Sequence, residues 1–138
     1  MSTEESIATY LQQLPPKQAA ELTLLHQQIL AKISPGKLWF LDGKNEEGKV
    51  VSNPNIGYGS CMLNYADGSS REFYKLGICA TKTGLSIYVM GLADKDFLKN
   101  TFGTALGKAK ITGYCISFKS LSDIDTSVLV AGIQEVLN

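Results

Sequence analysis

The stretch from Glu72 to Gly91 constrains the fold most, because it carries two apolar-rich runs on either side of a short polar connector. Both runs are rich in β-branched and aromatic residues, which suit a pleated and half-buried surface. The connector, Thr81–Gly84, is short enough to join two antiparallel strands. We therefore predict a β-hairpin here, and we expect the neighbouring β-segments to pair with it.

Residue alternation within the two runs predicts one apolar face and one mixed face. The apolar face is expected to carry Tyr74, Leu76, Ile78, Leu85, Ile87 and Val89. The mixed face is expected to carry Phe73, Lys75, Gly77, Cys79, Ser86, Tyr88 and Met90. An apolar sheet face needs a covering layer, which helices elsewhere in the chain can supply.

Apolar residues at helical spacing and capping residues predict four helices around these strands. Their expected ranges, with the capping residue where one is expected, are 3–14 (Thr3), 16–33, 94–102 (Asp94) and 122–137 (Ser122). Further strands are expected over 37–41, 56–65 and 111–119. In the last of these strands, alternation predicts Tyr114, Ile116 and Phe118 on one side and Gly113, Cys115 and Ser117 on the other. The fold class is predicted as α+β: a mostly antiparallel sheet of about five strands with N- and C-terminal helices packed on one face, in two layers.

Charge and cysteine content limit the function classes. Thirteen basic and thirteen acidic side chains leave no net charge, so we expect neither nucleic acid nor a membrane surface as a partner. The N-terminus lacks the apolar run of a signal peptide. The cysteines are odd in number and widely spaced, which favours reduced thiols in the cytoplasm.

Several landmarks, in this order and spacing, resemble the YdhG-like family of domains of unknown function from small bacterial proteins. They are Gly57–Ser60, Tyr65–Gly68, Gly77–Gly91 with Leu85–Tyr88 at its centre, Leu106–Lys108 and Cys115–Asp125. The likeness is good from Ile56 to the C-terminus and loose over the second helix. It implies a single α+β domain over residues 1–138. One branch of this family is linked to frataxin-like iron delivery, so the resemblance implies an iron chaperone as an alternative function.

The chain also departs from that family pattern. Ala80 and Thr81 stand before Lys82 where relatives carry a Pro-Arg pair, Ala109 stands where a histidine is frequent, and Gly113 replaces a common lysine. An anion site built from those Arg, His and Lys side chains in relatives would be weaker here. Lys82, Lys108, Lys110 and Lys119 still predict a modest basic patch near the hairpin connector and the last strand. Lysines at sheet edges also serve to block aggregation, so both interpretations stay open.

The small residues of the predicted strands suggest where a ligand could approach the backbone. In the predicted strands, Cys61, Cys79 and Cys115 fall on the same side as several glycines, so they could line one surface. Free cysteines also pack as small hydrophobic residues, so this alternative stays open. Tyrosines in the strands could add aromatic surfaces. The candidate binding residues are Tyr58, Cys79, Lys82, Tyr88, Lys108 and Cys115.

His26 falls near the middle of the apolar stripe of the second helix, where a core histidine held by one hydrogen bond is more usual than a base. An enzyme using Cys79 or His26 is a further alternative, but no third catalytic partner is identifiable. The carboxylate pairs near Asp94 and Asp123 open helices, so no catalytic residue, metal ligand or cofactor is assigned. The leading hypothesis is a non-enzymatic ligand-binding or protein-interaction domain that forms a homodimer to cover its second sheet face and takes a small anion or other small molecule.

Overall fold

The computed structural model describes residues 2–32 and 36–137. Its strands are β1 (Leu38–Leu41), β2 (Asn55–Tyr58), β3 (Cys61–Asn64), β4 (Ser70–Phe73), β5 (Leu76–Ala80), β6 (Leu85–Val89), β7 (Lys110–Ile111) and β8 (Cys115–Phe118). Its helices are α1 (Thr3–Gln13), α2 (Pro16–Lys32), α3 (Phe97–Phe102), a short 3-10 helix (Leu121–Asp123) and α4 (Thr126–Leu137). A six-stranded antiparallel sheet has the order β1-β2-β5-β6-β8-β7, and β3 pairs with β4 in a separate two-stranded sheet.

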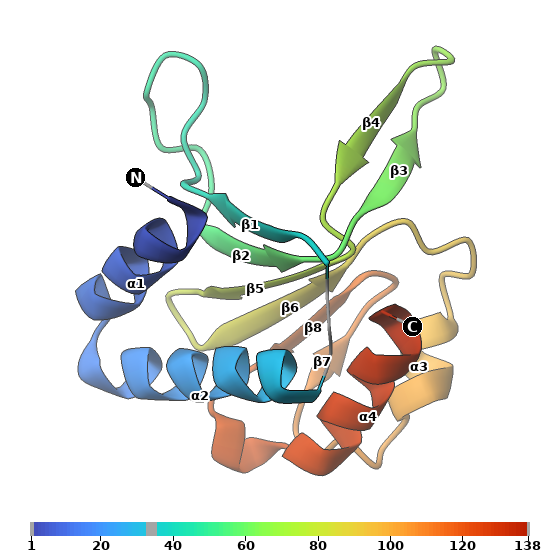
Figure 1. Cartoon of the computed structure of the whole chain (residues 1–138). Coiled ribbons are helices and arrows are strands. Elements are labelled where there is room, and N and C mark those ends of the chain that lie inside the picture. The colour runs from blue at the N-terminus through green and yellow to red at the C-terminus, as the bar shows by residue number, and fades with distance from the viewer. Residues whose placement is uncertain (1, 33–35, 138) are drawn as a thin grey trace.

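Helices from both ends of the chain lie against one face of the large sheet (Figure 1). Helix α1 contacts β1, α2 contacts β5, and α4 packs against both α2 and α3. The α+β class with helices on one face is therefore confirmed, with six strands in the main sheet. We call the side of the sheet beneath these helices the covered face and the opposite side the open face.

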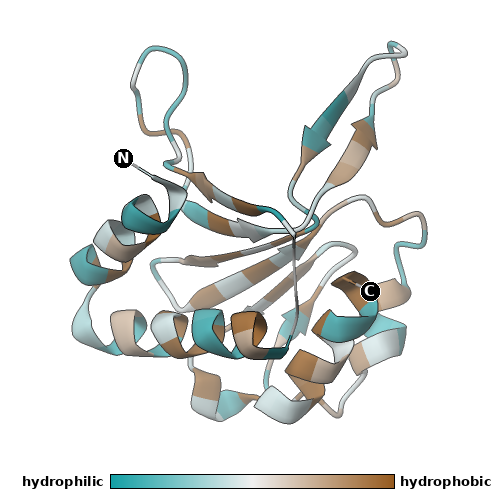
Figure 2. Ribbon diagram, viewed as in Figure 1, coloured by the Kyte–Doolittle hydropathy of each residue, from teal (hydrophilic) through white to brown (hydrophobic). Residues whose placement is uncertain are grey.

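The predicted hairpin is the centre of the sheet. Strands β5 and β6 pair from Leu76 with Val89 to Ala80 with Leu85, and the connector 81–84 joins them. Their alternation places apolar side chains on the covered face, together with residues of the neighbouring strands: Leu38, Phe40, Ile56, Tyr58, Ile111, Ile116 and Phe118. Figure 2 shows these apolar residues gathered on the main sheet and along α4, whereas the connector after β1 is largely hydrophilic.

The helices pack on the covered face through the apolar residues that recur at helical spacing in the sequence. Leu22, Leu25 and Ile29 of α2 are fully buried, as are Leu129 and, nearly so, Ile133 of α4. Each such side chain contributes roughly 1.5–3 kcal/mol by leaving water. The predicted position Ile33, at the end of the second helix, lies outside the described residues.

The single strand predicted over 56–65 is wrong, because the chain turns at Gly59. This glycine has φ +69°, a conformation that residues with a Cβ rarely adopt. The backbone therefore leaves the large sheet after Tyr58, and β3 starts a second hairpin with β4. Figure 1 shows this hairpin standing away from the body of the protein.

Two side chains expected on the apolar face lie on the open face instead. The first predicted run is interrupted between β4 and β5, so Tyr74 changes sides and its ring lies over Gly57 and Gly77. The last predicted strand is also interrupted: a turn separates β7 from β8, and Tyr114 stacks beside Tyr88. A turn that adds residues between two paired segments changes which side chains point to which face of the sheet.

Three predicted helix caps are displaced by a few residues. Ser2, not Thr3, accepts the amide of Glu5 at the start of α1. Asp96, not Asp94, is the residue before α3, and its side chain makes no cap hydrogen bond. Asp125, not Ser122, accepts the first amides of α4, because the 3-10 helix comes first. No helix in the described part of the chain is both long and apolar enough to cross a membrane.

Candidate ligand-binding site on the open face

Two rows of side chains cross the open face, as the strand register shows. The first row runs from Lys110 through Ser117 and Ser86 to Cys79, across β7, β8, β6 and β5. The second row, one step further along the strands, runs from Cys115 through Tyr88, Gly77 and Gly57 to Trp39. Adjacent rows on one face lie about 7 Å apart.

The first row ends in a hollow of about 880 Å³ where the β5–β6 connector meets β7 and the end of β8. We call it the lysine hollow. It is lined by Thr81, Thr83, Leu85, Ser86, Lys108, Ala109, Lys110, Ser117, Phe118, Lys119 and Asp123. Three lysines thus surround an opening that also presents four hydroxyl groups and only one carboxylate.

The lysines of this hollow have no anionic partner among the residues that the structure describes. Lys37 with Glu72 is the only ion pair in residues 2–32 and 36–137. Ammonium groups that share a hollow repel one another, so an anion placed between them gains from each of them. The hydroxyls of Ser86 and Ser117 lie 3.2 Å apart and form a hydrogen bond with each other, so the hydroxyl that accepts this bond keeps its own proton to donate to an anion.

One rim of the lysine hollow is held rigid by α2. The Gln18 amide donates to the carbonyls of Thr81 and Gly84 at 2.7 and 2.9 Å. The Gly84 amide in turn donates to the Thr81 hydroxyl. Gly84 packs directly on the backbone of Phe118, so a larger residue would not fit. The connector is therefore preorganised beside the end of β8.

The other rim is the connector over residues 106–110, for which the sequence predicts neither a helix nor a strand. Leu106 is fully buried, and Gly107 bridges to Ile124 with φ +112°. A Cβ on Gly107 would come 2.5 Å from the carbonyl oxygen of Asp123. The Lys108 amide donates to the same carbonyl at 2.9 Å, which fixes the backbone that carries Lys108.

The Cys79 thiol of the open face is not an activated nucleophile. Cys79 is fully buried, and burial raises its pKa to about 11, so it stays protonated at neutral pH. Burial also raises the pKa of Tyr88 to about 12. The Cys115 thiol is 3.4 Å from the Ser117 hydroxyl and therefore belongs to the same polar row.

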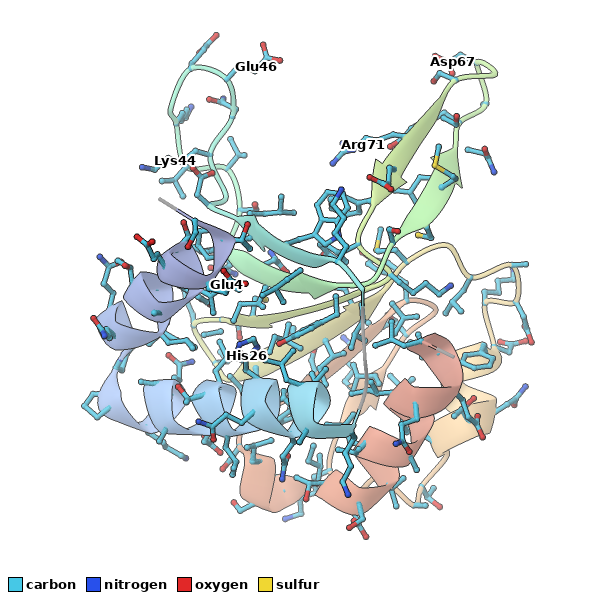
Figure 3. The ribbon with its side chains drawn as sticks, viewed as in Figure 1. Glu4, His26, Lys44, Glu46, Asp67 and Arg71 are labelled. Atoms are coloured by element: carbon cyan, nitrogen blue, oxygen red, sulfur yellow. The ribbon has the colours of Figure 1, made fainter. Side chains whose placement is uncertain are left out.

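Tyr58 and His26 lie on the covered face, away from Cys79. Their polar atoms are 2.6 Å apart, His26 Nδ1 to the Tyr58 hydroxyl, and Tyr58 is fully buried. Figure 3 shows His26 pointing from α2 toward the sheet. Burial lowers the pKa of His26 and raises that of Tyr58. His26 is therefore half-buried and held by one hydrogen bond, as predicted for a structural histidine, and the sheet separates it from Cys79.

The structure brings together part of the predicted binding set. Cys79, Tyr88 and Cys115 share the open face, and Lys108 lines the lysine hollow with Lys110 and Lys119. Lys82 lies exposed in the connector but does not line the hollow. Cys61 does not join the other cysteines, because its strand belongs to the small sheet.

Ser86 and Ser117 line the lysine hollow but were not predicted as site residues from the sequence. Both alternate with residues that were selected, Tyr88 and Cys115, so strand parity could have indicated them. The Tyr74 ring lies over Gly57 and Gly77 and so covers part of the second sheet face, which the homodimer prediction assigned to a partner. The homodimer stays a prediction.

Within the described residues, no three His, Cys, Asp or Glu side chains form a group that could hold a metal ion. Comparison of the chain with protein-family models, curated proteins and solved structures finds no match. The YdhG-like resemblance and the iron-chaperone alternative therefore stay predictions, and function has to be argued from the geometry of the open face.

Proposed function

We propose that this chain is a non-enzymatic binding domain for a small anionic molecule, which it holds in the lysine hollow. The observation that supports this proposal is the convergence of three lysines on a hydroxyl-lined opening of about 880 Å³, where none of them has an ion-pair partner in the described part of the chain. A phosphate or carboxylate group matches both features, because its oxygens accept hydrogen bonds from ammonium and hydroxyl donors.

The exposure of the lysines sets the expected strength of binding. All three are solvent-exposed, and an exposed ion pair contributes only about 0.2–1 kcal/mol. Together with the hydroxyl donors, they give an expected dissociation constant of roughly 0.1–10 mM for a free anion at low ionic strength. Binding should weaken as salt is added, since salt screens exposed charges.

Titration with sodium phosphate, followed by NMR chemical shifts at low ionic strength, tests the proposal. The amides of Lys108, Lys110, Ser117 and Lys119 should shift saturably. The triple variant Lys108→Gln, Lys110→Gln, Lys119→Gln should lose at least tenfold in affinity. The control variant Lys44→Gln, Lys49→Gln, Lys99→Gln changes the net charge equally at three exposed lysines outside the hollow, and it should bind almost as the native chain does. Equal loss in both variants, or no saturable shift in the native chain, would reject the proposal.

A further inference from the structure

A second hollow opens on the same face, beside the second row of side chains. Its volume is about 380 Å³, and it is lined by Leu41, Ser52, Asn53, Asn55, Phe73, Tyr74, Tyr88, Met90 and Tyr114. We call it the tyrosine hollow. Four of its nine lining residues are aromatic, and no lysine, arginine, aspartate or glutamate is among them. Its lining therefore suits an uncharged, flat group.

The aromatic side chains of the tyrosine hollow form two stacked pairs. Phe73 and Tyr74 have ring centroids 4.2 Å apart with planes 29° apart, and Tyr88 and Tyr114 have centroids 6.1 Å apart with planes 23° apart. Tyr114 is 56% exposed although it is a large aromatic residue. An additional aromatic ring stacked against Tyr114 would remove this surface from water.

Asn55 gives the tyrosine hollow an unused hydrogen-bonding group. Its Oδ1 is buried and has no hydrogen-bond partner, while its Nδ2 donates to the carbonyl of Asn53 at 2.8 Å. A buried acceptor without a partner is uncommon and calls for an explanation. The terminal torsion of a carboxamide is soft, so a rotation that gives up the Nδ2 hydrogen bond to Asn53 could turn Oδ1 toward a donor on the edge of a bound heteroaromatic ring.

The two hollows are neighbours on the sheet. Ser86 lines the lysine hollow and Tyr88 lines the tyrosine hollow, and these residues are two positions apart on β6. Their side chains therefore lie about 7 Å apart on one face.

We propose that the tyrosine hollow binds the planar heteroaromatic ring of the same ligand whose anionic group lies in the lysine hollow. This inference rests on the proposed function and specifies its ligand class: a small molecule that joins a nucleobase-like ring to a phosphate or carboxylate. Stacking on Tyr114 and hydrogen bonding to Asn55 would select the ring, while the lysines would hold the charge.

Calorimetric titrations with AMP, adenosine and sodium phosphate test the inference. AMP should bind at least tenfold more tightly than phosphate, because it occupies both hollows. Adenosine should bind weakly and compete with AMP. AMP that binds no more tightly than phosphate would overturn the ring site and leave the anion site intact. A native chain that binds none of the three would overturn the proposed function as well.

Variants at two exposed tyrosines separate stacking from general effects. Tyr114→Ala should weaken AMP binding roughly 5- to 100-fold, in line with the measured cost of removing an aromatic stacking partner, and should leave phosphate binding unchanged. Tyr65→Ala removes a tyrosine that is 46% exposed and does not line the hollow, so it should leave both affinities unchanged. Unchanged AMP affinity in Tyr114→Ala, or equal losses in both variants, would refute the ring site.

Discussion

The two faces of the six-stranded sheet are closed in different ways. On the covered face, α2 and α4 bring complete rows of aliphatic side chains from distant parts of the chain. On the open face, no helix of the described chain takes that place, and the ring of Tyr74 lies directly over Gly57 and Gly77. Helical layers leave a continuous core, whereas single rings leave hollows between them. The comparison explains why the candidate site lies on one face only.

The largest expected difference between the faces concerns truncation to alanine. Ile78 is fully buried on the covered face, so Ile78→Ala should lower the free energy of unfolding by about 2–5 kcal/mol. Tyr114→Ala on the open face should cost less than about 1 kcal/mol, because that side chain is largely exposed. Urea denaturation of both variants measures these costs. Similar values would mean that the open face is packed as tightly as the covered one.

A smaller effect is expected where Tyr74 closes the open face. A Cβ on Gly77 would lie 2.5 Å from the Tyr74 ring, so Gly77→Ala should destabilise the fold by about 1–3 kcal/mol through forced displacement of that ring. Gly113→Ala is the matched control, because its added Cβ would meet no atom closer than 3.5 Å. Thermal unfolding of both variants tests this. Equal stability would show that the ring moves aside freely.

The smallest expected effect is a pH dependence of the stability, caused by His26 on the covered face. Burial lowers the pKa of His26, the only histidine in the sequence. The unfolded chain, with a histidine pKa near 6.5, therefore binds more protons than the folded chain as the pH falls. The melting temperature should fall as the pH drops through about 6.5 and level off below the folded pKa of His26. In His26→Gln this part of the pH dependence should disappear; its persistence would assign it to other groups.

Residue alternation was sufficient to predict the strands that carry most of the fold. Strands β5 and β6 each follow a strict two-residue period, so the sequence predicted both their pairing and their faces. The same rule failed at Tyr74 and Tyr114, because each lies beside a turn that shifts the parity of its neighbours. Turns such as the one at Gly59 depend on a backbone conformation that the residue pattern does not specify.

The candidate site was predictable where it lies on regular strands and not where it depends on turns. Cys79, Tyr88 and Cys115 were expected on one face and lie there. Tyr58 was selected as a binding residue, but it alternates with Gly57 on β2 and therefore lies on the covered face. The sequence indicated several lysines near the hairpin, but the backbone bridge at Gly107 that positions Lys108 could not be inferred from local patterns.

The hydrogen bonds from Gln18 have a consequence for protein engineering. This side chain supports carbonyls that lie 63 and 66 residues further along the chain. A fragment that begins after α2 would keep every lysine of the hollow, but the loop between β5 and β6 would lose the two hydrogen bonds from Gln18. Grafting the strands alone into another scaffold would therefore transfer the charges but not the geometry that orients them.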